Sequence, residues 1–153
     1  MREADAINED QKSWLLAQVL RGLGEDPKGK TAAVWGLAFK PNTDDVREAP
    51  ALTVIRGLLD AGVKVRAHDP IAGENFHANL GRDGADIEYV EKPYQAAEGA
   101  EVLVLCTEWG PYRSPDFSRL RELMSGNRVY DGRNQWEADI AEGAGLRYWG
   151  VGR

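Results

Sequence analysis

Short apolar runs alternate with helical patterns along most of this chain, and this alternation constrains the fold more than any other feature. The runs that we interpret as strands cover residues 31–37, 63–68, 87–90, 102–106, 128–131 and 146–149. The helices expected between them cover residues 49–61, 72–80, 93–98, 116–124 and 135–142. Strands that are apolar throughout are typical of a parallel sheet covered by helices on both faces. We therefore predict an α/β fold: a Rossmann-like, doubly wound, mostly parallel six-stranded sheet.

One further helix precedes this alternation, and we expect it over residues 3–22. Its single buried face consists of Leu16, Val19, Leu20 and Leu23. Ile7, Trp14 and Leu15 extend the apolar surface of the helix. Three to four residues separate the members of that face, as in an amphipathic helix. The sequence thus divides into a helix at 1–24 and an α/β domain at 25–153. The helix packs on its own domain, on a partner chain or on a missing N-terminal part, and its start directly at Met1 suggests a chain cut from something longer.

Composition excludes several classes of protein. The net charge of −6 argues against nucleic-acid binding, because phosphate backbones require a basic surface. No apolar run approaches the roughly 20 residues that span a bilayer, and the polar N-terminus is not a signal peptide. Cys106 is the only cysteine, so no internal disulfide can form. We expect a cytoplasmic protein with no membrane partner.

Basic side chains follow several of the predicted strands. In an open α/β sheet, ligands bind beyond the carboxyl ends of the strands, where strands 1 and 4 diverge if the order is 3-2-1-4-5-6. The loops after strands 1 and 5 bring Lys40, Arg47 and Arg133 to this rim. Arg and Lys are the side chains that bind phosphate. The aromatic residues expected to offer a base or sugar an apolar face are Phe39, Trp109 and Tyr112.

The first strand-to-helix turn is not a standard dinucleotide site. It holds one glycine, Gly36, followed by a loop of about ten residues, so it lacks the G-x-G-x-x-G turn that wraps a pyrophosphate. Asp69 ends strand 2, but we interpret it as a turn residue before Pro70. The basic and aromatic residues of these loops therefore indicate a phosphorylated, ring-bearing ligand that is not bound by a glycine-rich turn.

The remaining candidates have plainer interpretations. Cys106 lies in a predicted buried strand, where a thiol acts as a small hydrophobic group. His68 and His77 are expected to be surface or packing residues, and no cluster has metal-ligand spacing. We expect Ser114 to cap the helix at 116–124.

Five motifs resemble the C-terminal domain of the UDP-glucose/GDP-mannose dehydrogenase family. They are GLAFKPNTDDVREAPAL after strand 1, HDP after strand 2, VLCTEW at strand 4, SPDF, and VYDGRN at strand 5. The resemblance covers the whole chain and is strongest for the branch that acts on UDP-glucose. Residues 1–24 resemble the end of the family's central interdomain helix, and residues 25–153 resemble its nucleotide-sugar (UDP)-binding domain.

The resemblance implies a function for the parent enzyme. Family members oxidise the C6 alcohol of a nucleotide sugar to a carboxylate with NAD, using a cysteine on an N-terminal domain that this chain lacks. By resemblance, Phe39, Lys40 and Arg133 contact UDP-glucose or UDP, and Arg47 reaches toward the NAD. The chain carries no catalytic residue and no metal site of the family, so the fragment is expected to be inactive alone. A homodimer or higher oligomer is implied.

Two alternatives remain open. The chain belongs to a sibling dehydrogenase acting on GDP-mannose or a UDP-N-acetylhexosamine, or it is a non-catalytic assembly module whose helix and sheet edge bind a partner. The resemblance leaves the role of Trp109 unassigned, either as a wall of the pocket or as a packing residue.

Overall fold

A computed structural model describes residues 2–81 and 86–151 of the protein, with side chains of the first helix described from Gln11 onward. Its helices are α1 (Arg2–Leu23), α2 (Pro50–Asp60), α3 (Gly73–Leu80), α4 (Pro93–Ala97), α5 (Phe117–Leu123) and α6 (Ala138–Gly143), with a 3-10 turn, η2, at Gly110–Tyr112. Its strands are β1 (Thr31–Trp35), β2 (Lys64–His68), β3 (Ile87–Tyr89), β4 (Val102–Leu105), β5 (Arg128–Asp131) and β6 (Arg147–Gly150). The predicted alternation of strands and helices is confirmed.

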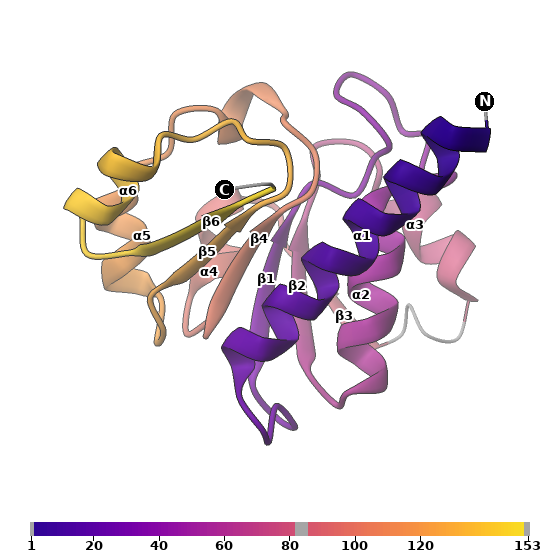
Figure 1. Ribbon diagram of the computed structural model, residues 1–153. Helices are drawn as coiled ribbons and strands as arrows, with labels where there is room; N and C mark the ends of the chain where they lie inside the picture. The colour runs from indigo at the N-terminus through magenta and orange to yellow at the C-terminus, as the bar shows by residue number, and fades with distance from the viewer. Residues whose placement is uncertain (1, 82–85, 152–153) are drawn as a thin grey trace.

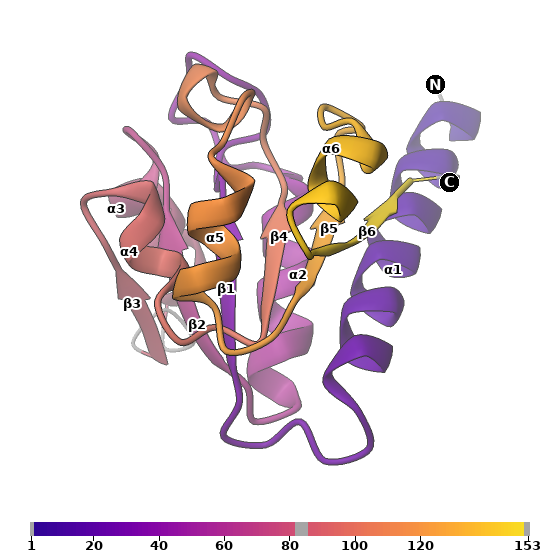
Figure 2. The ribbon, with the colours of Figure 1, turned by 90° about the vertical axis from the view of Figure 1, so that its left-hand side faces the viewer.

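The described strands form one six-stranded sheet in the order β3-β2-β1-β4-β5-β6. Each of the five strand pairings in this part of the chain is parallel. The predicted Rossmann-like class and strand order are therefore confirmed. Since the order reverses between β1 and β4, the loops that follow these two strands rise side by side at one edge of the sheet (Figures 1 and 2).

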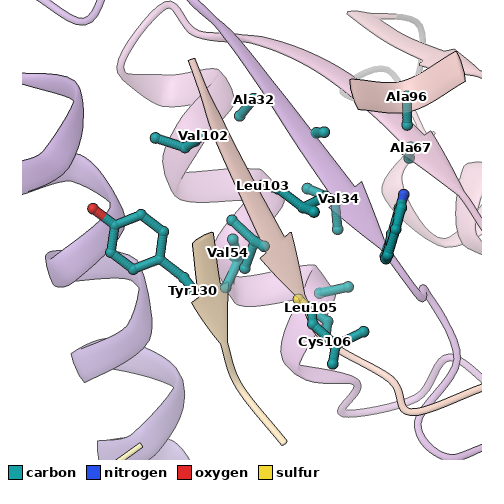
Figure 3. Packing of buried hydrophobic residues seen from close by; sticks show 14 of the residues in the cluster. Ala32, Val34, Val54, Ala67, Ala96, Val102, Leu103, Leu105, Cys106 and Tyr130 are labelled. Carbon is teal, nitrogen blue, oxygen red and sulfur yellow. The ribbon is translucent and has the colours of Figure 1, made fainter. Parts of the chain in front are cut away.

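Helices cover both faces of the sheet, which explains why its central strands are apolar throughout. Helices α1 and α2 lie on one face, and α4 and α5 lie on the other (Figures 1 and 2). Every residue of β4 is buried, and Cys106, which follows it, is 1% exposed among the packed residues of Figure 3. On the α4 and α5 side, the Trp35 ring stacks on Tyr112 with 5.0 Å between ring centroids. The core thus fills both sides of the strands that carry the predicted site loops.

Helix α1 packs across its own domain, which answers the question that the sequence left open. From Gln11 onward, its buried residues are Lys12, Leu15, Val19 and Leu23. Leu16 and Leu20, which the sequence placed on the buried face, are only partly buried. The buried face is rotated because α1 must contact both α2 and the sheet. The side chain of Ile7, also assigned to that face, lies outside the described residues. A Cβ at Gly57 of α2 would lie 2.3 Å from the Leu16 side chain, so the two helices meet closely.

Helices α5 and α6 begin at Phe117 and Ala138, both later than predicted. Asp116, not Ser114, is the N-cap of α5, and its carboxylate accepts a hydrogen bond from the backbone N–H of Arg119 at 3.1 Å. Helix α6 begins at Ala138 instead of residue 135, because Trp136 is buried and its backbone N–H is bonded to Asp131. Tertiary contacts therefore decide both boundaries.

Candidate functional site

The loops after β1 and β4 approach each other closely because Gly36 has no side chain. Its φ is 94°, and a Cβ there would lie 2.5 Å from the Cβ of Thr107. Thr107 is buried, and its hydroxyl donates to the carbonyl oxygen of Ala38 at 2.6 Å. The single glycine of this turn thus allows close packing between two strand ends.

A cavity of about 430 Å³ opens at this edge of the sheet. Its lining residues are Gln11, Lys12, Leu15, Phe39, Lys40, Glu48, Pro50, Gly132, Arg133 and Val151. The structure therefore brings together the three residues that the sequence assigned to the substrate, namely Phe39, Lys40 and Arg133. Phe39 is 44% exposed, which is unusual for a large apolar side chain in this protein and leaves its ring open to a ligand.

Arg133 is positioned by the two acidic residues nearest to it. The buried Asp131 accepts from the backbone N–H of Arg133 at 3.1 Å through Oδ1, while its Oδ2 accepts from the Tyr148 hydroxyl at 2.8 Å. Arg133 Nε donates to Glu108 Oε2 at 2.6 Å. The Arg133 side chain is 38% exposed and Glu108 only 15%, so the guanidinium is anchored at one end and open at the other. Such an arrangement leaves Nη groups able to bind an anion.

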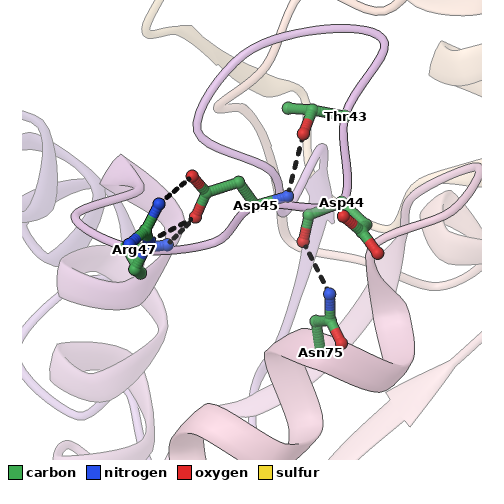
Figure 4. A network of polar contacts seen from close by, with 5 residues as sticks. All are labelled: Thr43, Asp44, Asp45, Arg47 and Asn75. Carbon is green, nitrogen blue, oxygen red and sulfur yellow. Dashed lines mark hydrogen bonds and ion pairs between the residues drawn. The ribbon is translucent and has the colours of Figure 1, made fainter.

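Arg47 does not join this group, and the expectation that three cations share one rim is wrong in that respect. Its Nε and Nη2 pair with Asp45 Oδ1 and Oδ2 at 3.1 and 3.0 Å (Figure 4). It lines a separate hollow with Asp44, Asp45, Val46, Asn75, Ala78 and Asn79, toward α3. The hydrogen bonds from Arg47 lower the pKa of Asp45 to about 2. The loop after β1 therefore presents Lys40 and Arg47 to different surfaces, and the Arg47 side chain is 82% exposed.

Trp109 and Tyr112 do not face the cavity, so the expectation that they offer a ligand an apolar face is wrong. Trp109 is 6% exposed and donates from its indole Nε1 to Asp69 Oδ2 at 3.0 Å, which makes it a packing residue. Tyr112 is fully buried against Trp35 and donates its hydroxyl proton to the carbonyl oxygen of His68. Both rings are buried in the core because the segment after β4 folds back onto the sheet.

Helix α1 contributes Gln11 and Lys12 to the cavity, and sequence reasoning missed both. Lys12 is only 8% exposed. It falls in the 12, 15, 19, 23 spacing of the helix's buried face. The sequence signal for Lys12 was a lysine on the apolar face of a helix, because a charged side chain is seldom buried unless it is paired.

The other candidate residues have structural roles, as predicted. Burial raises the pKa of Cys106 to about 12, so its thiol is a poor nucleophile. His68 is 6% exposed, and its Nδ1 lies 2.5 Å from the Tyr112 hydroxyl oxygen. His77 is exposed and packs its ring on Tyr89. Asp69 accepts from the backbone N–H groups of residues 71 and 72, as a turn residue does.

The described residues hold neither a cluster of metal ligands nor a membrane-spanning helix. Within residues 2–81 and 86–151, no group of three or more His, Cys, Asp and Glu side chains is arranged to hold a metal ion. No helix in the same ranges combines the length and apolarity needed to cross a membrane.

Comparison with known proteins assigns this chain to a family. Residues 33–138 match the UDP-binding domain of the UDP-glucose/GDP-mannose dehydrogenase family. The UDP-glucose 6-dehydrogenase of Pseudomonas aeruginosa is 42% identical over 100% of this chain, which covers 34% of that protein. The Rhizobium meliloti enzyme of the same name is 39% identical over 97% of this chain, which covers 33% of that protein. The chain thus spans about a third of the length of the curated relatives it matches.

Solved structures agree in fold. A UDP-glucose dehydrogenase from Pyrobaculum islandicum superposes with a TM-score of 0.77 at 36% identity, covering 95% of this chain and 30% of that one. A UDP-D-ManNAc dehydrogenase from Pyrococcus horikoshii gives 0.78 at 25% identity, covering 99% of this chain and 33% of that one. The match to the family covers the loops that carry Phe39, Lys40 and Arg133. The chain belongs to the UDP-glucose/GDP-mannose dehydrogenase family and corresponds to its UDP-binding domain.

Proposed function

We propose that this chain is the nucleotide-sugar-binding domain of an NAD-dependent UDP-glucose 6-dehydrogenase, which oxidises UDP-glucose to UDP-glucuronate in two steps. One observation carries the proposal: Lys40, Arg133 and the exposed ring of Phe39 line the same cavity of about 430 Å³. Small-ligand pockets have volumes of about 300–1,000 Å³. The cavity therefore has the size and the chemistry for a ring-bearing diphosphate.

Each lining side chain has a distinct role in this proposal. Lys40 supplies a compact charge to the diphosphate, and Arg133 binds it through the Nη groups that Glu108 leaves open. Phe39 packs against the uracil or the sugar ring. Lys12 adds a further cation from α1. Together these residues bind and orient the nucleotide sugar, and none of them acts on the carbon that is oxidised.

The cofactor is assigned to the surface that carries Arg47. The turn after β1 lacks the glycines of a dinucleotide site, so the residues of this chain do not form a complete NAD site. Arg47 is exposed on the side away from the cavity, where its guanidinium suits one phosphate of a cofactor bound mainly by another domain. NAD supplies the hydride acceptor when bound, and Arg47 contributes only to its binding.

Oxidation requires the rest of the parent enzyme. Cys106 is buried with a raised pKa, so it does not supply the family's nucleophile. We therefore expect the isolated chain to bind UDP and to oxidise nothing. The proposed partners are the enzyme's N-terminal domain and further copies of the same protein, in a homodimer or higher oligomer. One buried thiol suits a reducing compartment, and we place the enzyme in the cytoplasm.

UDP-glucose is favoured over the sugars of sibling enzymes by the comparisons. Among the solved structures, the UDP-glucose dehydrogenase from Pyrobaculum islandicum is 36% identical, whereas the UDP-D-ManNAc dehydrogenase from Pyrococcus horikoshii is 25% identical. The assembly alternative has less support, because the buried face of α1 is covered by its own domain.

Calorimetry on the 153-residue chain tests the proposal. UDP and UDP-glucose should bind, and GDP should bind more weakly. Lys40→Ala and Arg133→Ala should each weaken UDP binding by about tenfold to a hundredfold, as expected for losing one charge-assisted hydrogen bond. Arg56→Ala, which removes an exposed charge on α2, is the matched control and should bind UDP like the wild type. In the full-length enzyme, the first two variants should raise the KM for UDP-glucose. A folded chain that gives no heat at millimolar UDP would contradict the proposal that this domain holds a site of its own.

A further inference from the structure

Asp69 lies outside the cavity, yet its carboxylate joins three loops at the ligand edge of the sheet. The residue follows β2, and its Oδ2 accepts from the backbone N–H groups of Leu37 and Ala38 at 2.7 and 3.1 Å. The same oxygen accepts from Trp109 Nε1, after β4, at 3.0 Å. Oδ1 accepts from the backbone N–H groups of Ile71 and Ala72 at 2.9 and 2.8 Å. One carboxylate thus fixes the main chain directly before Phe39 and Lys40.

Further hydrogen bonds hold the backbone of residues 36–39. The N–H of Gly36 donates to the carbonyl oxygen of His68 at 2.8 Å, and the Ala38 carbonyl accepts from the Thr107 hydroxyl. The N–H of Phe39 donates to the carbonyl oxygen of Asp45 at 2.7 Å. The backbone N–H groups of residues 36–39 and the Ala38 carbonyl are therefore all bonded to other parts of the chain, while the side chains of Phe39 and Lys40 stay exposed.

We propose that Asp69 is a positioning residue of the nucleotide-sugar site, which holds the backbone at Leu37 and Ala38 so that Phe39 and Lys40 are presented to the ligand in a fixed arrangement. The inference rests on the proposed function of the cavity. A site whose groups are already ordered loses less conformational entropy on binding, so its affinity is higher.

The carboxylate is required because it accepts through both oxygens. An asparagine has one acceptor oxygen and one NH2 group that only donates. In Asp69→Asn, the NH2 must face either the N–H groups of Leu37, Ala38 and Trp109 or those of Ile71 and Ala72. Either orientation leaves donors unpaired at a partly buried position, so one set of contacts is lost with almost no change in side-chain size.

The test compares Asp69→Asn with Val65→Ala in the 153-residue chain. Val65 is 2% exposed at the other end of β2, so its truncation destabilises the same strand without touching the ligand loops. Three quantities are measured at a temperature where all proteins are folded: the Kd for UDP, the thermal midpoint, and the NMR order parameters of backbone amides 37–40 with the Trp109 indole N–H shift.

We expect Asp69→Asn to weaken UDP binding by about tenfold, since the loss of the charge-assisted bonds frees this segment, and to lower the order parameters of residues 37–40. Val65→Ala should lower the thermal midpoint but leave the Kd unchanged. Equal UDP affinity in Asp69→Asn and wild type, or equal losses in both variants, would overturn the positioning role. If wild type itself fails to bind UDP, the proposed function falls, whereas unchanged order parameters in Asp69→Asn would separately refute the positioning.

Discussion

The Nε of Arg133 donates to Oε2 of Glu108 at 2.6 Å, which ties the loop after β5 to the loop after β4. The pair holds the guanidinium at its Nε, and Arg133 lines the cavity. In the proposed site, the Nε of Arg133 anchors the side chain and the Nη groups bind the diphosphate. A lysine has a single point of contact and cannot do both.

Arg133→Lys should therefore weaken UDP binding nearly as much as Arg133→Ala, by about tenfold, although the positive charge is kept. Calorimetry with UDP on the two variants measures this. Lys40→Arg is the matched comparison, because Lys40 has no such anchor requirement in the proposed site, and it should retain most of the affinity. If Arg133→Lys binds UDP as tightly as wild type, charge alone matters and the anchoring by Glu108 is irrelevant.

A second prediction concerns Lys12, because this residue of α1 lines the cavity of the proposed site. Lys12→Met keeps the length and apolar stem of the side chain but removes its charge. UDP binding should weaken by about tenfold, since one cation near the diphosphate is lost. Lys28→Met, in the exposed segment before β1, is the control and should bind like wild type. Equal affinities of the two variants would remove α1 from the site.

Gly36 makes a prediction about stability. An alanine there would hold φ at 94° and place its Cβ 2.5 Å from the Thr107 Cβ and 2.6 Å from the Thr107 backbone nitrogen. Gly36→Ala should lower the free energy of unfolding by at least about 2 kcal/mol, from backbone strain and overpacking together. In Gly143→Ala the new Cβ meets nothing within 4 Å, so that variant should be neutral or slightly stabilising. Urea unfolding measures the stability of the two variants. Similar midpoints would contradict the close approach of Gly36, after β1, to Thr107, after β4.

His68 makes a prediction about pH. Burial lowers its pKa below 6.5 in the folded protein. As the pH falls below about 6.5, the unfolded chain binds a proton at His68 that the folded protein does not, so the free energy of unfolding decreases. His68→Gln should flatten this decline between about pH 7 and about pH 5. Thermal melts between these pH values measure the effect. If the midpoint of His68→Gln falls with pH as steeply as that of wild type, other groups cause the decline.

The sequence predicted the class of fold and three of the residues that line the cavity, for a physical reason. Apolar runs and helical spacing are local properties, and parallel strands place their carboxyl ends at one edge whatever the details of packing. Lys40 and Arg133, each a few residues beyond a strand, therefore met in one cavity as expected.

Side-chain direction within the loops was decided only by the tertiary structure. Arg47 turns away because Asp45 binds it, and Trp109 and Tyr112 are drawn into the core by Asp69 and Trp35. The same holds for Lys12, whose place in the cavity depends on how α1 crosses the sheet. The sequence alone determined which strand ends carry the chemistry, through periodicity and chain order. Tertiary structure decided which side chains line the cavity, because that choice depends on contacts between segments distant in the sequence.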